Sequence, residues 1–257
     1  MSAPAQSRFR RWWWRQQFTP NAWGLVVNPY YFARRGLYRG LAEFFPGLHG
    51  RVLDVGCGRK PYRHLVPAAD YVGLELDSPA ARELGAADLY YSGGSFPVPD
   101  ASFDAVICSQ VLEHVFTPQE FLAEIHRVLR PGGGLLLTTP FAWDEHSQPY
   151  DFGRYSSFGL AHILQQAGFE LVAQRKTCAD GRTLVQLGTG YLYKILRSRH
   201  RPLNLLVQLL LLAPLNVIGG VLAWVLPSNP DLFLDNIVLA RKTSASVDGT
   251  ARQEKSP

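Results

Sequence analysis

Val52-Leu-Asp-Val-Gly-Cys-Gly58 and Tyr71-Val-Gly-Leu-Glu-Leu-Asp77 are the two stretches that decide the fold of this chain. The first is an apolar run that ends in two glycines around a cysteine. This pattern is typical of a buried parallel strand leading into a turn where the backbone approaches a ligand closely. The second carries Glu75 roughly twenty residues further on, where a carboxylate suits the hydroxyl groups of a ribose at a neighbouring strand tip. Together they predict a Rossmann-like α/β sheet that binds a nucleoside.

The turn after the first strand separates two classes of nucleoside cofactor. A dinucleotide site has a third glycine in the pattern Gly-x-Gly-x-x-Gly, but this position is Pro61. A proline provides neither the free N–H nor the close helix–strand contact that the dinucleotide motif needs. S-adenosylmethionine has no pyrophosphate, and it carries an ammonium group that Asp54 can help to bind. The turn therefore favours S-adenosylmethionine over a dinucleotide.

Apolar runs recur along the chain with helical patterns between most of them. This alternation is typical of a parallel sheet with helices on both faces. The clearest helix is expected to begin after Thr117, with Pro118 at its first position and Glu120 three residues after the cap. The run Pro131-Gly-Gly-Gly134 is expected to end it. Strands are expected at residues 52–55, 71–76, 105–108, 135–138, 169–174 and 237–240.

Two further stretches carry a resemblance to a known family. They are Phe103-Asp-Ala-Val-Ile-Cys-Ser-Gln-Val-Leu-Glu-His114 and Glu124-Ile-His-Arg-Val-Leu-Arg-Pro-Gly-Gly133. With the glycine turn, they resemble the class I S-adenosylmethionine-dependent methyltransferases of the small-molecule type, over about residues 50–175. The resemblance implies a doubly wound, seven-stranded Rossmann-like sheet, mostly parallel, with an antiparallel last strand beside the sixth. It also implies S-adenosyl-L-methionine as the cofactor and methyl transfer as the reaction.

The resemblance assigns the cofactor contacts to residues near the carboxyl ends of the strands. Asp54 is expected near the methionyl ammonium, and Glu75 is expected to accept from the ribose hydroxyls. Asp88 matches the family position that meets the adenine amino group, although a loop-capping role is an open alternative. The cysteines show no metal-ligand spacing, so no metal is expected. The expected cofactor-binding residues are Asp54, Gly56, Cys57, Gly58, Glu75, Asp88, Ser109 and Gln110.

The loop at residues 140–155 leaves the carboxyl end of the expected fifth strand and therefore lies over the transferable methyl group. Alignment supplies much of the acceleration of an in-line displacement. An oxygen acceptor must also lose a proton, and His146 is the natural base. Asp151 is expected to orient that imidazole or bind a sugar hydroxyl, and Tyr155 to line the acceptor cavity. These three residues are the expected catalytic set, against the alternative of a loop held by ordinary polar contacts.

A second, looser resemblance indicates the class of acceptor. The spacing His146-x-x-Pro-Tyr-Asp-Phe-x-Arg-Tyr155 is similar to bacterial methyltransferases associated with polysaccharide and cell-envelope glycan genes. This favours O-methylation of a glycan or a lipid-linked intermediate, with the acceptor itself unidentified. Two alternatives stay open: a nucleic-acid or protein methyltransferase, and a non-catalytic scaffold that binds the cofactor. Nucleic acid is the weaker partner because the sequence shows no base-stacking signature.

The composition suits one domain with additions at both ends. The chain has 257 residues, of which 47% are hydrophobic, enough for a sizeable core. The cysteine spacing suggests no disulfide framework and the start shows no signal peptide, so a cytoplasmic setting is expected. The net charge is +5, and basic clusters surround three tryptophans near the N-terminus and occupy residues 194–201. The domain is expected over residues 21–242, after a flexible arm at 1–20 and before a disordered tail at 243–257.

An apolar helical insertion at about residues 182–230 precedes the last expected strand. No charged side chain occurs between Leu203 and Leu226, a length that could span a bilayer. Both ends return to one sheet, and Pro214 with Asn216 divides the stretch into two shorter halves. We therefore expect a helical hairpin that dips into an anionic membrane at its inner face, with basic residues at the headgroups. The alternative is an apolar cap on the sheet or a homodimer surface.

Overall fold

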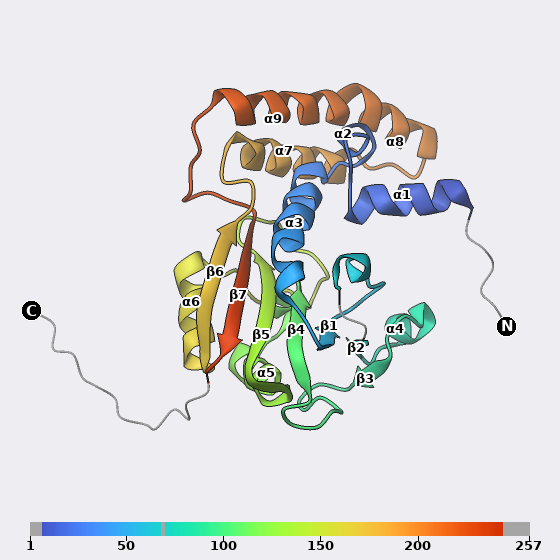
Figure 1. Cartoon of the computed structure of the whole chain (residues 1–257). Coiled ribbons are helices and arrows are strands. Elements are labelled where there is room, and N and C mark those ends of the chain that lie inside the picture. Colours follow the sequence, from blue (N-terminus) through green and yellow to red (C-terminus); the bar gives the residue numbers. More distant parts are fainter. Residues whose placement is uncertain (1–6, 68–69, 244–257) are drawn as a thin grey trace, which may run out of the picture.

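A computed structural model describes residues 7–67 and 70–243 of the chain (Figure 1). Its centre is a seven-stranded sheet in the order β3-β2-β1-β4-β5-β7-β6. Neighbouring strands are parallel except for the two pairs that β7 makes. This confirms the predicted Rossmann-like sheet with an antiparallel last strand. The strands are β1 Arg51–Val55, β2 Asp70–Leu76, β3 Leu89–Tyr91, β4 Phe103–Ser109, β5 Leu129–Pro140, β6 Phe169–Lys176 and β7 Asp235–Lys242.

The boundaries around β5 differ from the expected ones. Helix α5 (Pro118–Val128) begins where predicted, but the Thr117 side chain makes no capping hydrogen bond. The strand follows the helix directly at Leu129, so the glycine run lies inside β5, where its register against β4 shifts. The short edge strand β3 escaped prediction because its three residues are all only partly buried.

Helices cover both faces of the sheet, and β4 shows how the sequence separates them. Alternate residues of a strand point to opposite faces. Val106 and Cys108 accordingly join one buried cluster, while Ala105 and Ile107 join the other. Helix α5 and α6 (Ser157–Gln166) cover the first face. The second face is covered by α3 (Tyr31–Phe44), whose buried side chains include Leu37 and Leu41. The remaining short elements are η1 Phe45–Gly47, η2 Arg63–Leu65, α4 Pro79–Leu84 and η3 Leu112–His114.

The N-terminal arm is not a flexible segment over its described part, which corrects the expectation for residues 1–20. Residues Arg8–Phe18 form helix α1, whose first turn is capped by the Ser7 hydroxyl. A short helix α2 (Gly24–Val27) follows and leads into α3. The guanidinium of Arg34 on α3 lies 5.3 Å from the centroid of the Phe18 ring. The arm is therefore packed against the domain.

The uncharged stretch of the apolar insertion lies almost entirely in one long helix, Arg201–Val225, rather than in the expected hairpin. Helix α7 (Gly181–Leu196) is followed by α8 (Arg201–Val207), a π-helical turn η4 (Gln208–Leu212) and α9 (Ala213–Val225). Pro214 does not break this helix, because it falls in the first turn of α9, where the π-helical turn already displaces the hydrogen-bond ladder. Figure 1 shows α7 and α9 side by side beyond the end of the sheet where β6 finishes.

Arg201–Val225 is the one helix among the described residues that is long and apolar enough to cross a membrane. At the C-terminus, the backbone N–H and the hydroxyl of Thr243 both donate to the Gly168 carbonyl. The predicted tail therefore does not begin at Thr243, and its other residues, 244–257, lie outside the described part.

Candidate donor and acceptor sites

The glycine turn after β1 is shaped for close approach of a ligand. Gly56 and Gly58 both have positive φ angles, +70° and +49°, which side chains rarely adopt. A Cβ atom on Gly56 would collide with Val111, whereas the space beside Gly58 is open. The carboxylate of Glu75, near the end of β2, accepts a 2.8 Å hydrogen bond from the Gly58 N–H. The structure thus brings the two predicted motif residues together at the carboxyl edge of the sheet.

Asp54 lies under this turn, buried in β1. The Tyr71 hydroxyl donates to its carboxylate. Burial raises the pKa of Asp54 to about 7, although the hydrogen bond from Tyr71 acts in the opposite direction. An incoming ammonium group would stabilise the ionised form, so this carboxyl is suited to the role that the motif predicts.

Cys57 contributes backbone and not its thiol. The side chain is buried, and its Sγ lies against Gly73. Burial raises the pKa of the Cys57 thiol to about 12, so it is protonated at neutral pH.

Asp88 is placed differently from its predicted role. It directly precedes β3 and is held by contacts within the protein. Its carboxylate accepts from the Gly73 N–H at 2.7 Å and pairs with Lys60 Nζ at 2.6 Å. The structure therefore gives Asp88 the loop-anchoring role that the sequence left open.

Ser109 and Gln110 lie at the carboxyl end of β4, as predicted. Both side chains hydrogen-bond to the Thr138 hydroxyl, at 3.0 and 3.2 Å. Gln110 has a φ of +59°, an unusual conformation for a residue with a side chain. Together these contacts fix the Gln110 amide at the carboxyl edge of the sheet.

A cavity of about 310 Å³ opens over the glycine turn, where the motifs predict the donor site. Its wall also contains Phe18 from α1 and Arg34 and Leu37 from α3, which sequence reasoning missed. No local motif marks these residues, because they reach the cavity only when the N-terminal helices pack across the sheet. The described residues lining it include Gly56, Cys57, Gly58, Ser109 and Gln110.

A second cavity of about 360 Å³ adjoins the first. Arg34, Leu37 and Gln110 line both, so these three residues form the boundary between them. The second cavity is closed by Trp143 and His146 of the predicted acceptor loop and by Lys194 of α7. The remaining residues on its wall are Tyr30, Ala33, His114, Asp144 and Asp235.

His146 faces this cavity and is held by Asp151. The Asp151 carboxylate accepts from the His146 backbone N–H at 2.9 Å and lies 3.3 Å from its Nδ1. The Asp144 carbonyl also lies 3.3 Å from Nδ1, whereas the guanidinium of Arg154 is more distant at 3.5 Å. Two acceptors at the shorter distance favour a proton on Nδ1, which leaves the lone pair on Nε2. Burial lowers the pKa of His146, so the ring favours its neutral form.

The rest of the predicted catalytic set behaves differently. Both oxygens of Asp151 bond to Arg154, and these bonds hold the pKa of that carboxyl well below its usual range. Asp151 therefore holds the loop through Arg154 and the His146 backbone N–H. Tyr155 packs against the core cluster of the sheet, and the described residues that line the acceptor cavity do not include it. Its predicted contact with the acceptor stays a prediction.

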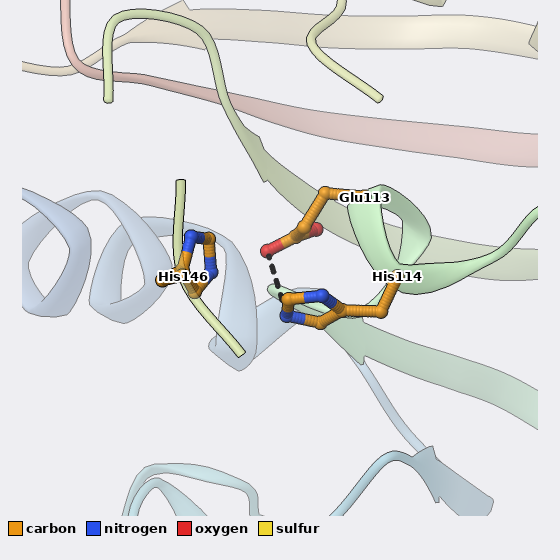
Figure 2. A group of neighbouring side chains, drawn as sticks. All are labelled: Glu113, His114 and His146. Atoms are coloured by element: carbon orange, nitrogen blue, oxygen red, sulfur yellow. Dashed lines mark ion pairs between the residues drawn. The ribbon is translucent and has the colours of Figure 1, made fainter. Parts of the chain in front are cut away.

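A buried acid that the sequence did not single out lies behind the cavity. Glu113 in η3 has a side chain with 0% exposure, and burial raises its pKa to about 8. Figure 2 shows its carboxylate facing the rings of His114 and His146. The signal in the sequence was an acid beside a histidine within an apolar stretch at a strand end. Asp235 at the start of β7 is a second buried acid here, and burial raises its pKa to about 6.

Comparison with known proteins supports the same fold and cofactor. A family model described as a methyltransferase domain matches residues 53–137. A probable S-adenosylmethionine-dependent methyltransferase of Mycolicibacterium smegmatis is 32% identical over 162 residues, covering 58% of this chain and 62% of that protein. A ubiquinone biosynthesis O-methyltransferase of Paracidovorax citrulli is 33% identical over 144 residues, covering 50% and 56%. The chain thus spans about three fifths of the length of these curated relatives.

Among solved structures, that of the 4+2 cyclase SpnF matches with a TM-score of 0.52 and 20% identity, over 81% of this chain and 82% of the cyclase. A cyclase with this fold shows that the fold alone does not fix the reaction. The family model is more specific, because it covers the glycine turn and the strands from β1 to β5 that carry the donor site. On this motif, this topology and these relatives, the chain is similar to the class I S-adenosylmethionine-dependent methyltransferases, and its residues 53–137 match a methyltransferase domain.

Proposed function

We propose that this chain transfers the methyl group of S-adenosylmethionine to an oxygen atom of an acceptor held in the second cavity. The observation that carries the proposal is the shared boundary of the two cavities at Arg34, Leu37 and Gln110. A donor over the glycine turn and an acceptor beside His146 would meet at this boundary. In-line displacement needs this arrangement, since the attacking atom must approach opposite the leaving sulfur.

The chemistry then follows from the neutral imidazole. An oxygen lone pair of the acceptor forms the new bond to the methyl carbon. The bond from carbon to sulfur breaks, and its electron pair returns to the sulfur to give S-adenosylhomocysteine. The hydroxyl proton passes to Nε2 of His146, and Asp151 holds the ring in the required orientation.

The acceptor that best suits this cavity is a hydroxyl of a glycan or a lipid-linked intermediate. Tyr30 and Trp143 lie 5.7 Å apart, centroid to centroid, and offer flat apolar surfaces of the kind that pack on sugar rings. Asp144 and Lys194 form an ion pair at the cavity wall and can exchange hydrogen bonds with hydroxyl groups. The similarity to an O-methyltransferase supports oxygen as the accepting atom.

The test is transfer of a labelled methyl group from S-adenosylmethionine to fractionated cell material. We expect label in the glycolipid or polysaccharide fraction, sensitive to mild glycosidic cleavage. Label in nucleic acid or protein would instead support the other methyltransferase classes. Donor binding without label in any fraction would support a non-catalytic scaffold.

We also propose that the long helix of the insertion seats the enzyme on an anionic membrane. An ordinary surface helix turns polar side chains to water and apolar side chains to the core, and this helix does the opposite. The amides of Gln208 and Asn216 point inward, where they donate to the carbonyls of Val26, Leu25 and Asn28. Apolar side chains point outward instead, including Leu210 with 74% and Trp224 with 88% exposure. Exposing such a band to water is costly, whereas burying it in lipid is favourable.

Charge and neighbouring elements favour lipid as the occupant of this face. Arg197, Arg199 and Arg201 are exposed at the start of the long helix, and each cation near an anionic surface contributes roughly 1 kcal/mol. Phe9 and Trp13 of α1 line a groove together with Leu205. Tryptophan and arginine side chains are the residues that membrane interfaces favour.

Flotation with vesicles of phosphatidylglycerol tests the membrane proposal. The wild type is expected to float, and the double variant Leu210→Asp with Trp224→Asp is expected to remain in the dense fraction. Phe158→Asp is the matched control, because Phe158 is 84% exposed on α6 and lies outside this face. A soluble wild-type homodimer that the double variant dissociates would overturn the proposal in favour of a dimer surface.

A further inference from the structure

We infer that Glu113, His114 and His146 form a binding site for a divalent transition-metal ion. One carboxylate oxygen and one nitrogen from each ring lie within 4.8 Å of one another. They come from two separate segments, η3 after β4 and the loop after β5, which converge at the acceptor cavity (Figure 2). Two imidazoles and one carboxylate are a ligand set that proteins use for Zn²⁺ and for non-haem Fe²⁺, with positions left open for a substrate.

The Glu113 carboxylate is the observation that points to a ligand. Its Oε1 atom has no hydrogen-bond partner among the described residues, although the side chain is completely buried. The other oxygen accepts a long hydrogen bond of 3.4 Å from the Thr139 hydroxyl. An unpartnered buried carboxylate costs several times the free energy of an ordinary hydrogen bond. A cation between Glu113 and the two rings would supply the missing partner.

Both imidazoles are set to coordinate through Nε2. Nδ1 of His114 lies 2.6 Å from the Tyr150 carbonyl, which can only accept, so this nitrogen carries the proton. Nδ1 of His146 faces the Asp144 carbonyl and the Asp151 carboxylate in the same way. Metal-binding histidines are typically held by such a bond from the other ring nitrogen. Nε2 of His114 then lies 3.9 Å from Oε1 of Glu113.

Charge and distance are compatible with an ion at this point. The guanidinium of Arg154, 3.5 Å from Nδ1 of His146, is paired with Asp151 at 2.6 Å. Ligand atoms on bonds of about 2.1 Å in a tetrahedral site lie roughly 3.4 Å apart. The widest separation of 4.8 Å must therefore contract on binding. Rotation of the His146 ring on its loop can provide this.

An ion here changes the role of His146 under the proposed function, on which this further consequence rests. The two imidazoles would hold the ion, and the ion would lower the pKa of a bound acceptor hydroxyl so that its oxygen attacks as an alkoxide. The released proton would leave with solvent. Ion binding itself requires no methyl transfer, so it can be tested separately.

The experiment is titration of the chelator-treated full chain with Zn²⁺, by calorimetry and by competition with a fluorescent chelator. We expect one ion per chain, and an affinity that falls about 100-fold or more in Glu113→Gln, His114→Ala and His146→Ala. His126→Ala is the matched control, since this half-buried histidine packs on Phe169 outside the cluster. Co²⁺ absorption should indicate nitrogen and oxygen ligands without thiolate.

Two further readouts separate the outcomes. S-adenosylhomocysteine binding should be unchanged in Glu113→Gln, which shows that the variant is folded. Failure of Zn²⁺, Co²⁺ and Mn²⁺ to bind, or binding that all three variants retain, overturns the metal site. Methyl transfer that persists in excess chelator would leave the proposed function standing and reject a role for the ion in it.

Discussion

The donor half and the acceptor half of this site are built in opposite ways. The donor half uses backbone conformation and two carboxylates, Asp54 and Glu75, from two strands that are adjacent in sequence and in the sheet. The acceptor half uses side chains from η3, the loop after β5, helix α3, helix α7 and the start of β7. The difference teaches that a cofactor common to many enzymes is bound by a local motif, whereas an individual substrate is bound by tertiary packing.

The largest expected effect is confined to the donor half. Glu75→Ala removes the proposed ribose acceptor together with the acceptor for the Gly58 N–H. Two hydrogen bonds to a charged group are lost, so affinity for S-adenosylhomocysteine should fall about 1000-fold. Calorimetry measures this, with Glu83→Ala on the exposed side of α4 as the control. An unchanged dissociation constant would remove Glu75 from the donor site.

The next effect is confined to the acceptor half. His146→Ala should leave S-adenosylhomocysteine affinity unchanged while methyl transfer falls about 100-fold or more, as expected for loss of a base or an ion ligand. The rate of methyl transfer is measured as label incorporated into the cell fraction that accepts the methyl group. His162→Ala, an exposed histidine on α6, serves for comparison. If the His146 variant also lost donor affinity, the separation of the two halves would be broken.

A smaller effect concerns pH and the donor half. The pKa of Asp54 is about 7 in the free protein, so most molecules must lose a proton before an ammonium group can pair with it. Affinity should therefore rise about tenfold between roughly pH 5.5 and roughly pH 7, as the carboxyl ionises. Calorimetry with S-adenosylhomocysteine in buffers of different ionisation enthalpy also detects the released proton. Asp54→Asn should bind more weakly and show a flatter profile; an equally steep profile would assign the titration to another group.

The smallest effect concerns Phe18 of helix α1, which lies in the wall of the donor cavity. Phe18→Ala opens one wall of the donor cavity and removes the ring under Arg34. Loss of this contact, worth about 1 kcal/mol, should weaken donor binding roughly fivefold. Phe9→Ala, further along the same helix and absent from the described lining of that cavity, should have no such effect. Equal responses of both variants would indicate a general effect of helix packing.

The sequence predicted the sheet and the donor motif because both are local. Gly58 and Glu75 are recognisable from their spacing, and each parallel strand is a short apolar run. The prediction was wrong where tertiary packing decides. Pro214 did not break the long helix, because a π-helical turn precedes it. Arg8–Phe18 is ordered because it has α3 to pack against. Glu113 could not be assigned, since His146, one of its two partners, comes from the loop after the next strand.

The position of α7 has a consequence for how a lipid-linked acceptor would reach the enzyme. Helix α7 packs against α9 of the long helix, and its Lys194 lines the acceptor cavity. Neighbouring helices pack about 8–10 Å apart, so a single helix layer separates the proposed bilayer from the reacting hydroxyl. A glycan on a lipid could enter the cavity while its acyl chains remain in the bilayer. Extraction would cost about 0.8 kcal/mol for each methylene group, and this geometry makes it unnecessary.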